Sequence, residues 1–449
     1  MLWNRRHWML AGAAGAAAAG RIVGRAEAAG SSQSPTPLTI TELRITPFAL
    51  PDPPLLAASG CHGPYYLRNV VEAVTDGGIV GIGETTGGAR VTEALEQARQ
   101  HVIGQNAFAY RRFAGAMSEA AYAAVEVACL DACGKATGRR LCELLGGPVR
   151  EEVEFAAYLF YRYAADHPEL LKDPRVCDDR GAGRQALDAY GEVRTPEAMG
   201  RLAEQFRDQY GFRVFKLKGG VLPPDVELDS MRVLRERMGN KALLRIDPNA
   251  RWTRETAVRI GKQLADVSLE YYEDPVAGQE AMAEVRTLTG LPTSTNMCVT
   301  RYQHIPDALR LHPVDVVLCD HHYWGGMTGC LALGPISEPA GWKLSQHSNS
   351  HAGITMAAMI HLAASLPQLT YASDTHYPWL VDKAEIIAGG KLPIRGGKMQ
   401  LPKSPGLGVE LDRDQLARAQ EIYRRSGMKQ RDDAGTMQRI EPGWKRELF

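Results

Sequence analysis

The sequence predicts a closed α/β barrel of the (β/α)8 type, a modified TIM barrel, which follows a smaller N-terminal α+β capping domain. Three observations support this prediction. The chain has 449 residues, more than a single hydrophobic core usually serves. Strand-like and helix-like segments alternate eight times after about residue 150. Polar residues end successive strand-like segments at intervals of 23 to 29 residues, close to the roughly 30 residues of one βα unit in such a barrel.

The first 37 residues are expected to lie outside the fold. Arg5 and Arg6 precede an Ala-rich apolar stretch, which ends in a small-residue cleavage pattern at residues 26–28. We therefore interpret residues 1–30 as an export signal of the twin-arginine type, which would make the mature protein periplasmic or exported. A disordered Ala-rich tail on a cytoplasmic protein is the alternative. Residues 31–37 are rich in Ser and Pro and are expected to form a linker.

The composition narrows the class of partner. Lys and Arg together number 52, as do Asp and Glu, so the chain lacks the basic surplus of a nucleic-acid-binding protein. The body of the chain has no apolar run of membrane-spanning length. We expect a small-molecule substrate, no membrane contact in the mature form, and a homo-oligomer. Cys129 and Cys133 are four residues apart in a helical pattern, which favours core packing over a disulfide.

Residues 38–149 are predicted to form the capping domain. Residues 40–50 alternate apolar and polar side chains, as a half-buried strand does. Strands at 70–74 and 79–82 flank a Thr-Asp-Gly-Gly turn, which predicts a hairpin. Helical patterns follow at residues 91–103, 118–134 and 142–145.

Residues 150–380 are predicted to form the barrel. Its strands are expected at residues 153–160, 213–218, 243–247, 269–274, 292–296, 314–320, 343–347 and 370–374. Its helices are expected at residues 196–210, 225–238, 254–265, 280–288, 302–311, 327–337 and 354–366. Thr195 before Pro196 is a typical helix start, and Gly239 and Gly290 stand where helices would end. Eight alternations favour a closed barrel, although an open parallel sheet has the same order of elements.

Two further segments flank the barrel elements. Residues 161–192 are long and polar for a loop, and loops of this length are often lids or binding segments. Residues 381–449 are expected to form a C-terminal segment that packs back on the capping domain.

Three oxygen-bearing side chains predict a metal site. Asp247, Glu273 and Asn296 would end the third, fourth and fifth barrel strands. Parallel neighbours lie about 4.8 Å apart, so these side chains can converge on one ion. An all-oxygen set with room for water and substrate suits Mg²⁺. The alternative for each residue alone is a cap on the following helix.

Nitrogen bases are predicted on both sides of that site. Lys216 and Lys218 are two apart on the second strand and point to the same face. Repulsion between them is expected to lower their pKa values, so that one becomes a neutral base. Asp320 and His347 would end the adjacent sixth and seventh strands, where a carboxylate orients an imidazole for acid–base work. The alternatives are a solvated lysine at the rim and a buried structural histidine.

The positions of these groups predict a reaction type. The second and sixth strands are opposite each other in an eight-stranded barrel, so the bases flank the metal. A substrate carboxylate bound to Mg²⁺ would present its α-carbon between them. This combination of a Lys or His base with Mg²⁺ is a described way to stabilise an enediolate.

The combined motifs resemble those of the enolase superfamily, and within it the glucarate dehydratase family. The similarity runs from about residue 59 to residue 444. Most of the superfamily uses an acid as the third metal ligand, whereas this subgroup uses an Asn, as at position 296. The matching motifs are Lys216-Leu217-Lys218, Asp247-Pro248-Asn249, Glu273-Asp274-Pro275, Thr295-Asn296-Met297, Asp320, His347-Ser348-Asn349, Asp374-Thr375-His376 and Arg431-Asp432-Asp433.

The resemblance implies residue roles and a hydro-lyase reaction. Lys218 is implied as one base and the pair of His347 and Asp320 as the other. Lys216 and Asn249 would stabilise the enediolate. The implied reaction removes the proton α to a carboxylate of an aldaric acid such as glucarate, and elimination of the β-hydroxyl gives a 4-deoxy-5-oxo acid. The residues implied to hold substrate oxygens are Asn349, His62, Tyr158, His376 and Arg431.

The chain also departs from the family pattern. The segment at residues 106–118 is shortened and lacks a threonine used against the substrate, Arg301 replaces an acid, and residues 321–324 are altered. An export signal is unusual in this family of cytosolic enzymes of carbohydrate acid catabolism. Two alternative functions therefore accompany the dehydratase: an acid-sugar epimerase with the same bases, and an exported, non-catalytic acid-sugar binding protein.

Overall fold

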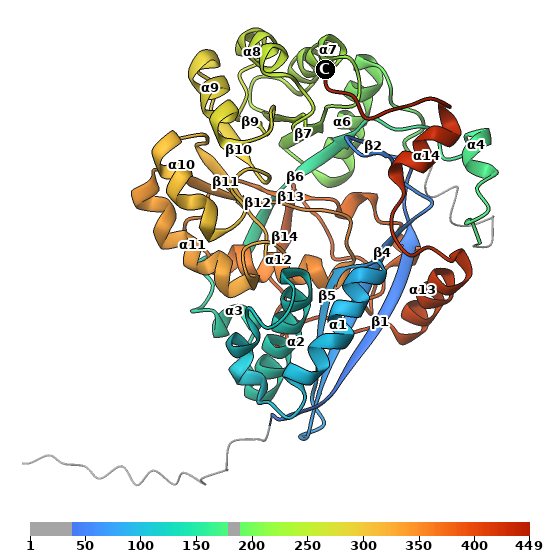
Figure 1. Cartoon of the computed structure of the whole chain (residues 1–449), viewed down its shortest axis with the longest axis vertical. Helices are drawn as coiled ribbons and strands as arrows, with labels where there is room; N and C mark the ends of the chain where they lie inside the picture. The colour runs from blue at the N-terminus through green and yellow to red at the C-terminus, as the bar shows by residue number, and fades with distance from the viewer. Residues whose placement is uncertain (1–37, 178–188) are drawn as a thin grey trace, which may run out of the picture. The chain divides into compact units, whose positions relative to one another are not determined.

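The capping domain is built on a three-stranded antiparallel sheet in the computed structural model, which describes residues 38–177 and 189–449 (Figure 1). Strand β1 (Ile40–Pro51) pairs with β4 (Tyr65–Thr75), and β4 pairs with β5 (Val80–Thr86). The predicted hairpin is confirmed, because the backbone N–H and the hydroxyl of Thr75 both donate to the carbonyl of Ile79. Strand β4 is longer than predicted, since it pairs along nearly the whole of β1.

Helix α2 (Glu119–Thr137) packs so closely against β5 that the residues of β5 facing it must be glycine. A Cβ on Gly81 would lie 1.9 Å from the carbonyl oxygen of Ala128, and a Cβ on Gly83 would lie 2.1 Å from that of Ala124. The predicted packing role of the two cysteines of α2 is confirmed, because both are buried free thiols in this core. The other helices of this region are α1 (Ala89–Val102), η1 (Ala107–Phe113) and α3 (Leu141–Leu144).

Eight parallel strands form the barrel, which confirms the predicted fold class. Their order is β12-β11-β10-β9-β8-β7-β6-β13. The ends of this row meet, because the hydroxyl of Ser345 donates to the carbonyl of Ala372 at 2.9 Å and the N–H of Tyr371 to that of Leu344 at 3.3 Å. The strands are β6 (Glu152–Phe160), β7 (Val214–Lys218), β8 (Leu243–Asp247), β9 (Tyr271–Glu273), β10 (Thr293–Thr295), β11 (Val316–Cys319), β12 (Lys343–Gln346) and β13 (Ser373–Thr375).

Helices surround these strands (Figure 1). The hydroxyl of Thr195 caps the first of them by accepting from the N–H of Ala198, and Gly239 and Gly290 follow two others, as predicted. Every residue of helix α12 is buried, because the helix contacts both the barrel and the capping domain. The barrel helices are α6 (Pro196–Tyr210), α7 (Pro224–Met238), α8 (Arg254–Gln263), α9 (Gln279–Thr289), α10 (Ile305–Leu311), α11 (Gly326–Ala340) and α12 (Gly353–Ser365).

The C-terminal segment adds elements that the sequence pattern did not indicate. Strand β14 (Lys398–Gln400) pairs antiparallel with β6. Helix α13 (Arg413–Ser426) lies against β1, and its Arg413 forms an ion pair of 2.5 Å with Glu72 of the neighbouring strand β4. The described residues, 38–177 and 189–449, belong to one unit, so the boundaries at 149 and 380 stay predictions. Shorter elements are β2 (Leu56–Ala57), β3 (Gly60–Cys61), α4 (Pro168–Leu171), α14 (Asp433–Ile440), η2 (Leu264–Asp266), η3 (Tyr302–His304), η4 (Tyr377–Trp379) and η5 (Asp382–Ala384).

Some predictions fall outside the described residues. The export signal, the linker and part of the predicted lid lie at residues 1–37 and 178–188. Within 38–177 and 189–449, none of the helices combines the length and apolar character that crossing a membrane requires.

The buried histidine His361 makes the stability of the fold depend on pH. Its Nδ1 accepts from the N–H of Cys142, its Nε2 donates to the carbonyl of Leu407, and burial lowers its pKa to about 4. Because this pKa lies below the ordinary value of 6.5, the stabilising contribution is complete above pH 6.5 and is lost as the pH falls toward 4. We expect His361 to contribute about 3 kcal/mol to the loss of stability over that range, measured as the difference between the wild type and the His361→Gln variant in urea unfolding. His361→Gln, which can make both hydrogen bonds, should flatten the profile, while the exposed control His101→Gln should follow the wild type.

Candidate active site

The predicted metal ligands lie at the ends of neighbouring barrel strands. Asp247 ends β8, Glu273 ends β9, and both carboxylates are fully buried. Asn296 follows β10, whose Ser294 pairs with Glu273. The backbone N–H of Asn296 donates to Asp274 at 2.8 Å. The barrel thus brings the three residues of the predicted set to adjacent positions at one end.

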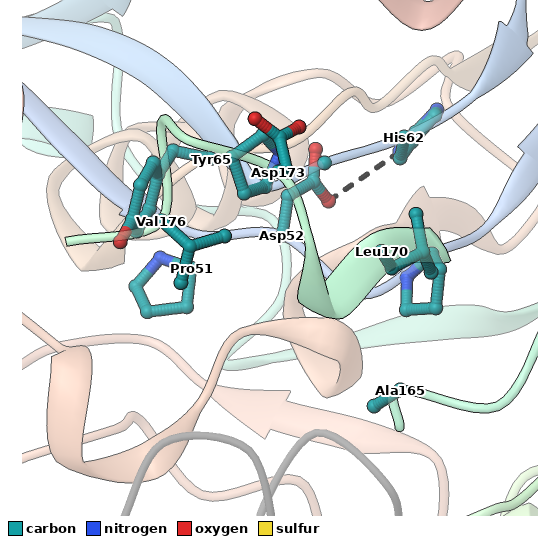
Figure 2. Close-up of a pocket in the computed structure, with 11 residues that line it drawn as sticks. Pro51, Asp52, His62, Tyr65, Ala165, Leu170, Asp173 and Val176 are labelled. Atoms are coloured by element: carbon teal, nitrogen blue, oxygen red, sulfur yellow. Dashed lines mark hydrogen bonds and ion pairs between the residues drawn. The ribbon is translucent and has the colours of Figure 1, made fainter. Parts of the chain in front are cut away.

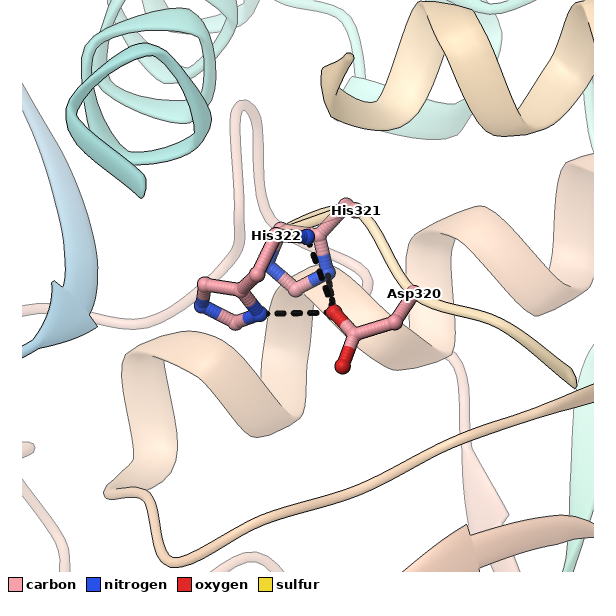
Figure 3. A group of neighbouring side chains, drawn as sticks. All are labelled: Asp320, His321 and His322. Carbon is pink, nitrogen blue, oxygen red and sulfur yellow. Dashed lines mark hydrogen bonds and ion pairs between the residues drawn. The ribbon is translucent and has the colours of Figure 1, made fainter. Parts of the chain in front are cut away.

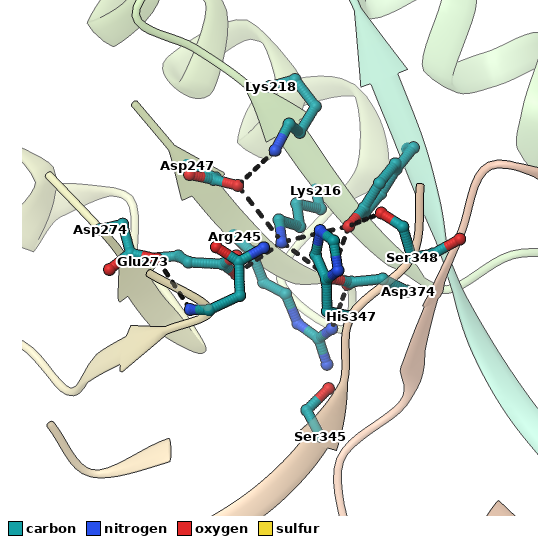
Figure 4. A network of polar contacts seen from close by, with 12 residues as sticks. Lys216, Lys218, Arg245, Asp247, Glu273, Asp274, Ser345, His347, Ser348 and Asp374 are labelled. Atoms are coloured by element: carbon teal, nitrogen blue, oxygen red, sulfur yellow. Dashed lines mark hydrogen bonds and ion pairs between the residues drawn. The ribbon is translucent and has the colours of Figure 1, made fainter. Parts of the chain in front are cut away.

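Lys216 lies at the centre of the buried carboxylates (Figure 4). Its Nζ is 2.6 Å from Oε2 of Glu273, 2.8 Å from Oδ2 of Asp374 and 3.4 Å from Oδ2 of Asp247. Burial acts to lower the pKa of Lys216, but the surrounding carboxylates, Asp374 foremost, hold it well above its ordinary value. The prediction that repulsion between the two lysines lowers their pKa values is therefore wrong for Lys216, because opposite charges are closer than its neighbour on the strand.

Lys218 lies at the C-terminal end of the same strand, β7. Its Nζ donates to Oδ2 of Asp247 at 2.5 Å, and its side chain keeps 10% exposure, whereas that of Lys216 has none. Asn249 donates to the other oxygen of Asp247 through its backbone N–H at 3.0 Å and through its side-chain amide. Lys218 is thus the lysine that a molecule in the barrel mouth could reach.

The carboxylates fit a divalent cation. Both oxygens of Glu273 are buried; Oε2 lies against the ammonium of Lys216 at 2.6 Å, whereas Oε1 has no hydrogen-bond partner within the described part of the chain. Burial and the nearby charge of Asp247 hold the pKa of Glu273 well above its ordinary value. A buried carboxylate oxygen without a donor is unfavourable, and a cation that prefers oxygen ligands would compensate it.

Asp320 and His347 form the predicted pair. Nδ1 of His347 lies 2.8 Å from Oδ2 of Asp320. The other oxygen of Asp320 accepts from the backbone N–H of His322 at 2.8 Å and lies 2.7 Å from its Nδ1 (Figure 3). Burial acts to raise the pKa of Asp320, but His322 and His347 hold it well below its ordinary value. Asp320 therefore stays ionised and holds the ring of His347.

The capping domain supports the loop that carries Asn349. Arg68 on β4 donates to Oδ1 of Asn349 at 3.4 Å, to the hydroxyl of Thr355 at 3.0 Å, and to Glu84 at 2.7 Å. Glu84 in turn accepts from the N–H groups of Ala352 and Thr355. Arg68 and Glu84 are not among the site residues predicted from the sequence.

Two of the residues predicted to contact the substrate, His62 and His376, lie side by side. His62 stacks on His376 with ring centroids 6.0 Å apart, and Nδ1 of His62 lies 3.4 Å from Asp52 beside a pocket lined by Leu170 and Val176 (Figure 2).

Arg431 and Tyr158 have protein partners of their own. Arg431 donates twice to Asp433, at 3.1 and 2.7 Å, and Asp433 also accepts from Ser59. The hydroxyl of Tyr158 donates to Asp374 at 2.7 Å, so its ring, which lies 5.5 Å from Nζ of Lys218, is the part that faces the site.

Asp374 is a further residue of the site, which was not predicted from the sequence. Its Oδ2 accepts from Tyr158 and Lys216, and Arg245 donates to its Oδ1 at 3.3 Å. Asp374 lies on β13, 27 residues after His347, so the strand-end spacing itself could have identified it. Asp374 therefore pairs with two buried cationic side chains inside the barrel, those of Lys216 and Arg245.

We expect Asp374→Asn to destabilise the protein by about 3–5 kcal/mol, because it leaves Lys216 and Arg245 short of a buried counter-charge. Urea unfolding of the metal-free protein measures this. The matched control is Asp382→Asn, whose side chain is 88% exposed and which should change little. Equal losses in the two variants would contradict the role given to Asp374.

Known proteins resemble the chain over nearly its whole length. A family model described as enolase C-terminal domain-like matches residues 198–415. A probable glucarate dehydratase from Streptomyces coelicolor is 40% identical over 440 residues, which cover 91% of this chain and 97% of that protein.

Solved structures agree with these matches. An enolase from Thermobispora bispora complexed with magnesium and formate has a TM-score of 0.83 and 41% identity, covering 92% of this chain and 100% of that one. An enolase from Pseudomonas fluorescens with bound magnesium, potassium and tartrate has a TM-score of 0.83 and 39% identity, covering 91% of this chain and 98% of that one. Magnesium, the ion predicted from the oxygen ligand set, is present in both.

Proposed function

Because the chain belongs to the enolase superfamily, we propose that it is a Mg²⁺-dependent dehydratase of an acid sugar, a glucarate-like aldarate. The reaction removes the proton α to a carboxylate and eliminates the β-hydroxyl, giving a 4-deoxy-5-oxo acid. The observation that carries the proposal is the pair of nitrogen bases, Lys218 on β7 and His347 after β12, which flank a cluster of buried carboxylates.

The carboxylates are proposed to hold the cation. Asp247, Glu273 and Asn296 would bind Mg²⁺, which would neutralise the charge that develops on the substrate carboxylate as its α-proton leaves. Lys216 and Asn249 carry N–H groups beside Asp247 and would donate to the same charge. The related enolase with magnesium and tartrate supports this class of ligand, since tartrate is a hydroxy dicarboxylate.

Proton transfer is proposed for the two bases. Lys218 removes an α-proton that faces it, and His347 removes one on the opposite face. In the second step His347 gives its proton to the departing hydroxyl, which leaves as water. Asp320 orients the ring by binding Nδ1, so that Nε2 exchanges the proton.

The remaining contacts are proposed to hold the far end of the substrate. His62, His376 and Arg431 supply polar groups and Asn349 an amide, while Tyr158 supplies its ring. These groups would select the acid sugar.

A panel of acid sugars tests the function. The full chain is incubated with each diastereomer and Mg²⁺, and a keto-acid trapping reagent detects the product, with solvent deuterium exchange followed in parallel. We expect a keto acid from at least one aldarate. Exchange without keto acid would favour the epimerase, which the two opposed bases also suit, and tight binding without exchange would favour the binding protein.

A further inference from the structure

One buried histidine beside the catalytic pair has no visible role. His321 is 1% exposed, and neither of its ring nitrogens has a hydrogen-bond partner among the described residues. Burial and the neighbouring His322 hold its pKa well below the ordinary value, so the ring is neutral. A buried polar ring without partners is unfavourable unless something outside the chain binds it.

The ring of His321 lies beside two other side chains that can bind a metal ion, those of Asp320 and His322 (Figure 3). Nδ1 of His321 is 3.9 Å from Oδ1 of Asp320, and Nδ1 of His322 is 2.7 Å from the same oxygen. The two rings have centroids 4.1 Å apart. One ligand atom from each residue lies within 4.8 Å of the others.

These separations suit a small cation with nitrogen ligands. Two ligands on a tetrahedral Zn²⁺ with bonds of about 2.0–2.1 Å are roughly 3.3 Å apart, between the two distances observed here. Neutral imidazole prefers Zn²⁺, Co²⁺ or Ni²⁺, whereas Mg²⁺ prefers the oxygen set of Asp247 and Glu273. The two clusters therefore differ in the ion they select.

We propose that Asp320, His321 and His322 form a second metal site, which takes a nitrogen-seeking divalent cation of the Zn²⁺ class. As the cation binds Nδ1 of a neutral His322 ring, the ring proton moves to Nε2, and a protonated ring must lose a proton first, so affinity falls as the pH falls. A fourth position remains for water or a substrate oxygen.

Occupancy of this site would inhibit turnover. The cation draws charge from Asp320, whose other oxygen holds Nδ1 of His347 at 2.8 Å. This consequence rests on the proposed function, since it assumes that His347 transfers protons. The binding itself does not.

Metal binding is measured directly on the full chain with Mg²⁺ at saturation. Isothermal titration with Zn²⁺ should show one site in the wild type and in Glu273→Gln, which removes an oxygen ligand of the Mg²⁺ set. His321→Ala should weaken binding by more than about tenfold, and the exposed control His101→Ala should not.

Two measurements separate binding from catalysis and from folding. X-ray absorption of the zinc-loaded wild type should show two imidazole ligands, which needs no variant. Zinc should inhibit the wild type at saturating Mg²⁺ and inhibit His321→Ala less. An all-oxygen zinc shell, equal affinity in His321→Ala and the wild type, or loss of zinc binding in Glu273→Gln would each overturn the proposal, whether or not the enzyme dehydrates an aldarate.

Discussion

Lys218→Met and His347→Asn are expected to fail at different steps. With Lys218→Met, dehydration of the diastereomer whose α-proton faces the lysine should fall by about 10²–10⁴-fold, because its general base is gone. The opposite diastereomer should still react, since His347 can remove its proton and return it to the leaving hydroxyl. With His347→Asn, both diastereomers should lose dehydration. The one that faces Lys218 should nevertheless still exchange its α-proton with solvent deuterium.

This asymmetry is measured by keto-acid formation and by nuclear magnetic resonance of substrate recovered from deuterium oxide. The matched controls are Lys262→Met and His101→Asn, both at exposed helix positions, which should keep wild-type rates. Undiminished dehydration in either active-site variant on every substrate would remove that residue from the proton path. Loss of exchange together with dehydration in His347→Asn would assign both steps to His347.

Most of the barrel could be predicted because each unit carries its own local signals. The helix that starts at Thr195 and the one that ends before Gly290 have capping residues at both the predicted and the observed positions. The missed elements depend on partners far away in the chain. Strand β14 has three residues, too few to show a period, and it forms because β6 offers it an edge. The same holds for the two-residue strands β2 and β3.

The spacing of strand ends predicted those site residues that end a barrel strand. That spacing brought Asp247, Glu273 and Asp320 to the barrel mouth, and extending it by one more unit would have included Asp374. The charge state of Lys216 was not predictable in this way, because it depends on carboxylates contributed by other strands. A sequence shows which residues share a strand and a face, but the balance of attraction and repulsion is set across the barrel.

Glu273→Gln is expected to separate metal binding from stability. The wild-type protein should gain thermal stability when Mg²⁺ is added, because the ion binds the folded state only. Glu273→Gln should lose that gain and should lower turnover by about 10³-fold or more, since the ion contributes several kcal/mol to stabilising the developing charge. The metal-free protein should lose less stability than Asp374→Asn does, because burial and Asp247 already disfavour the charged form of Glu273 and Asp374 remains paired with Lys216. The uncharged amide of Gln has the same shape and removes the free-energy cost of burying the charged carboxylate.

Thermal unfolding with and without Mg²⁺, beside turnover, provides the measurement. Glu280→Gln, an exposed change in the first turn of α9, is the matched control and should keep both the Mg²⁺-dependent gain and the activity. A variant that lost stability equally with and without Mg²⁺ would indicate that Glu273 serves the fold through Lys216 rather than the ion. A variant that kept its Mg²⁺-dependent gain would exclude Glu273 as a ligand. Only the combination of a little-changed metal-free protein and an absent response to Mg²⁺ fits a buried carboxylate whose Oε1 has no donor until a cation binds.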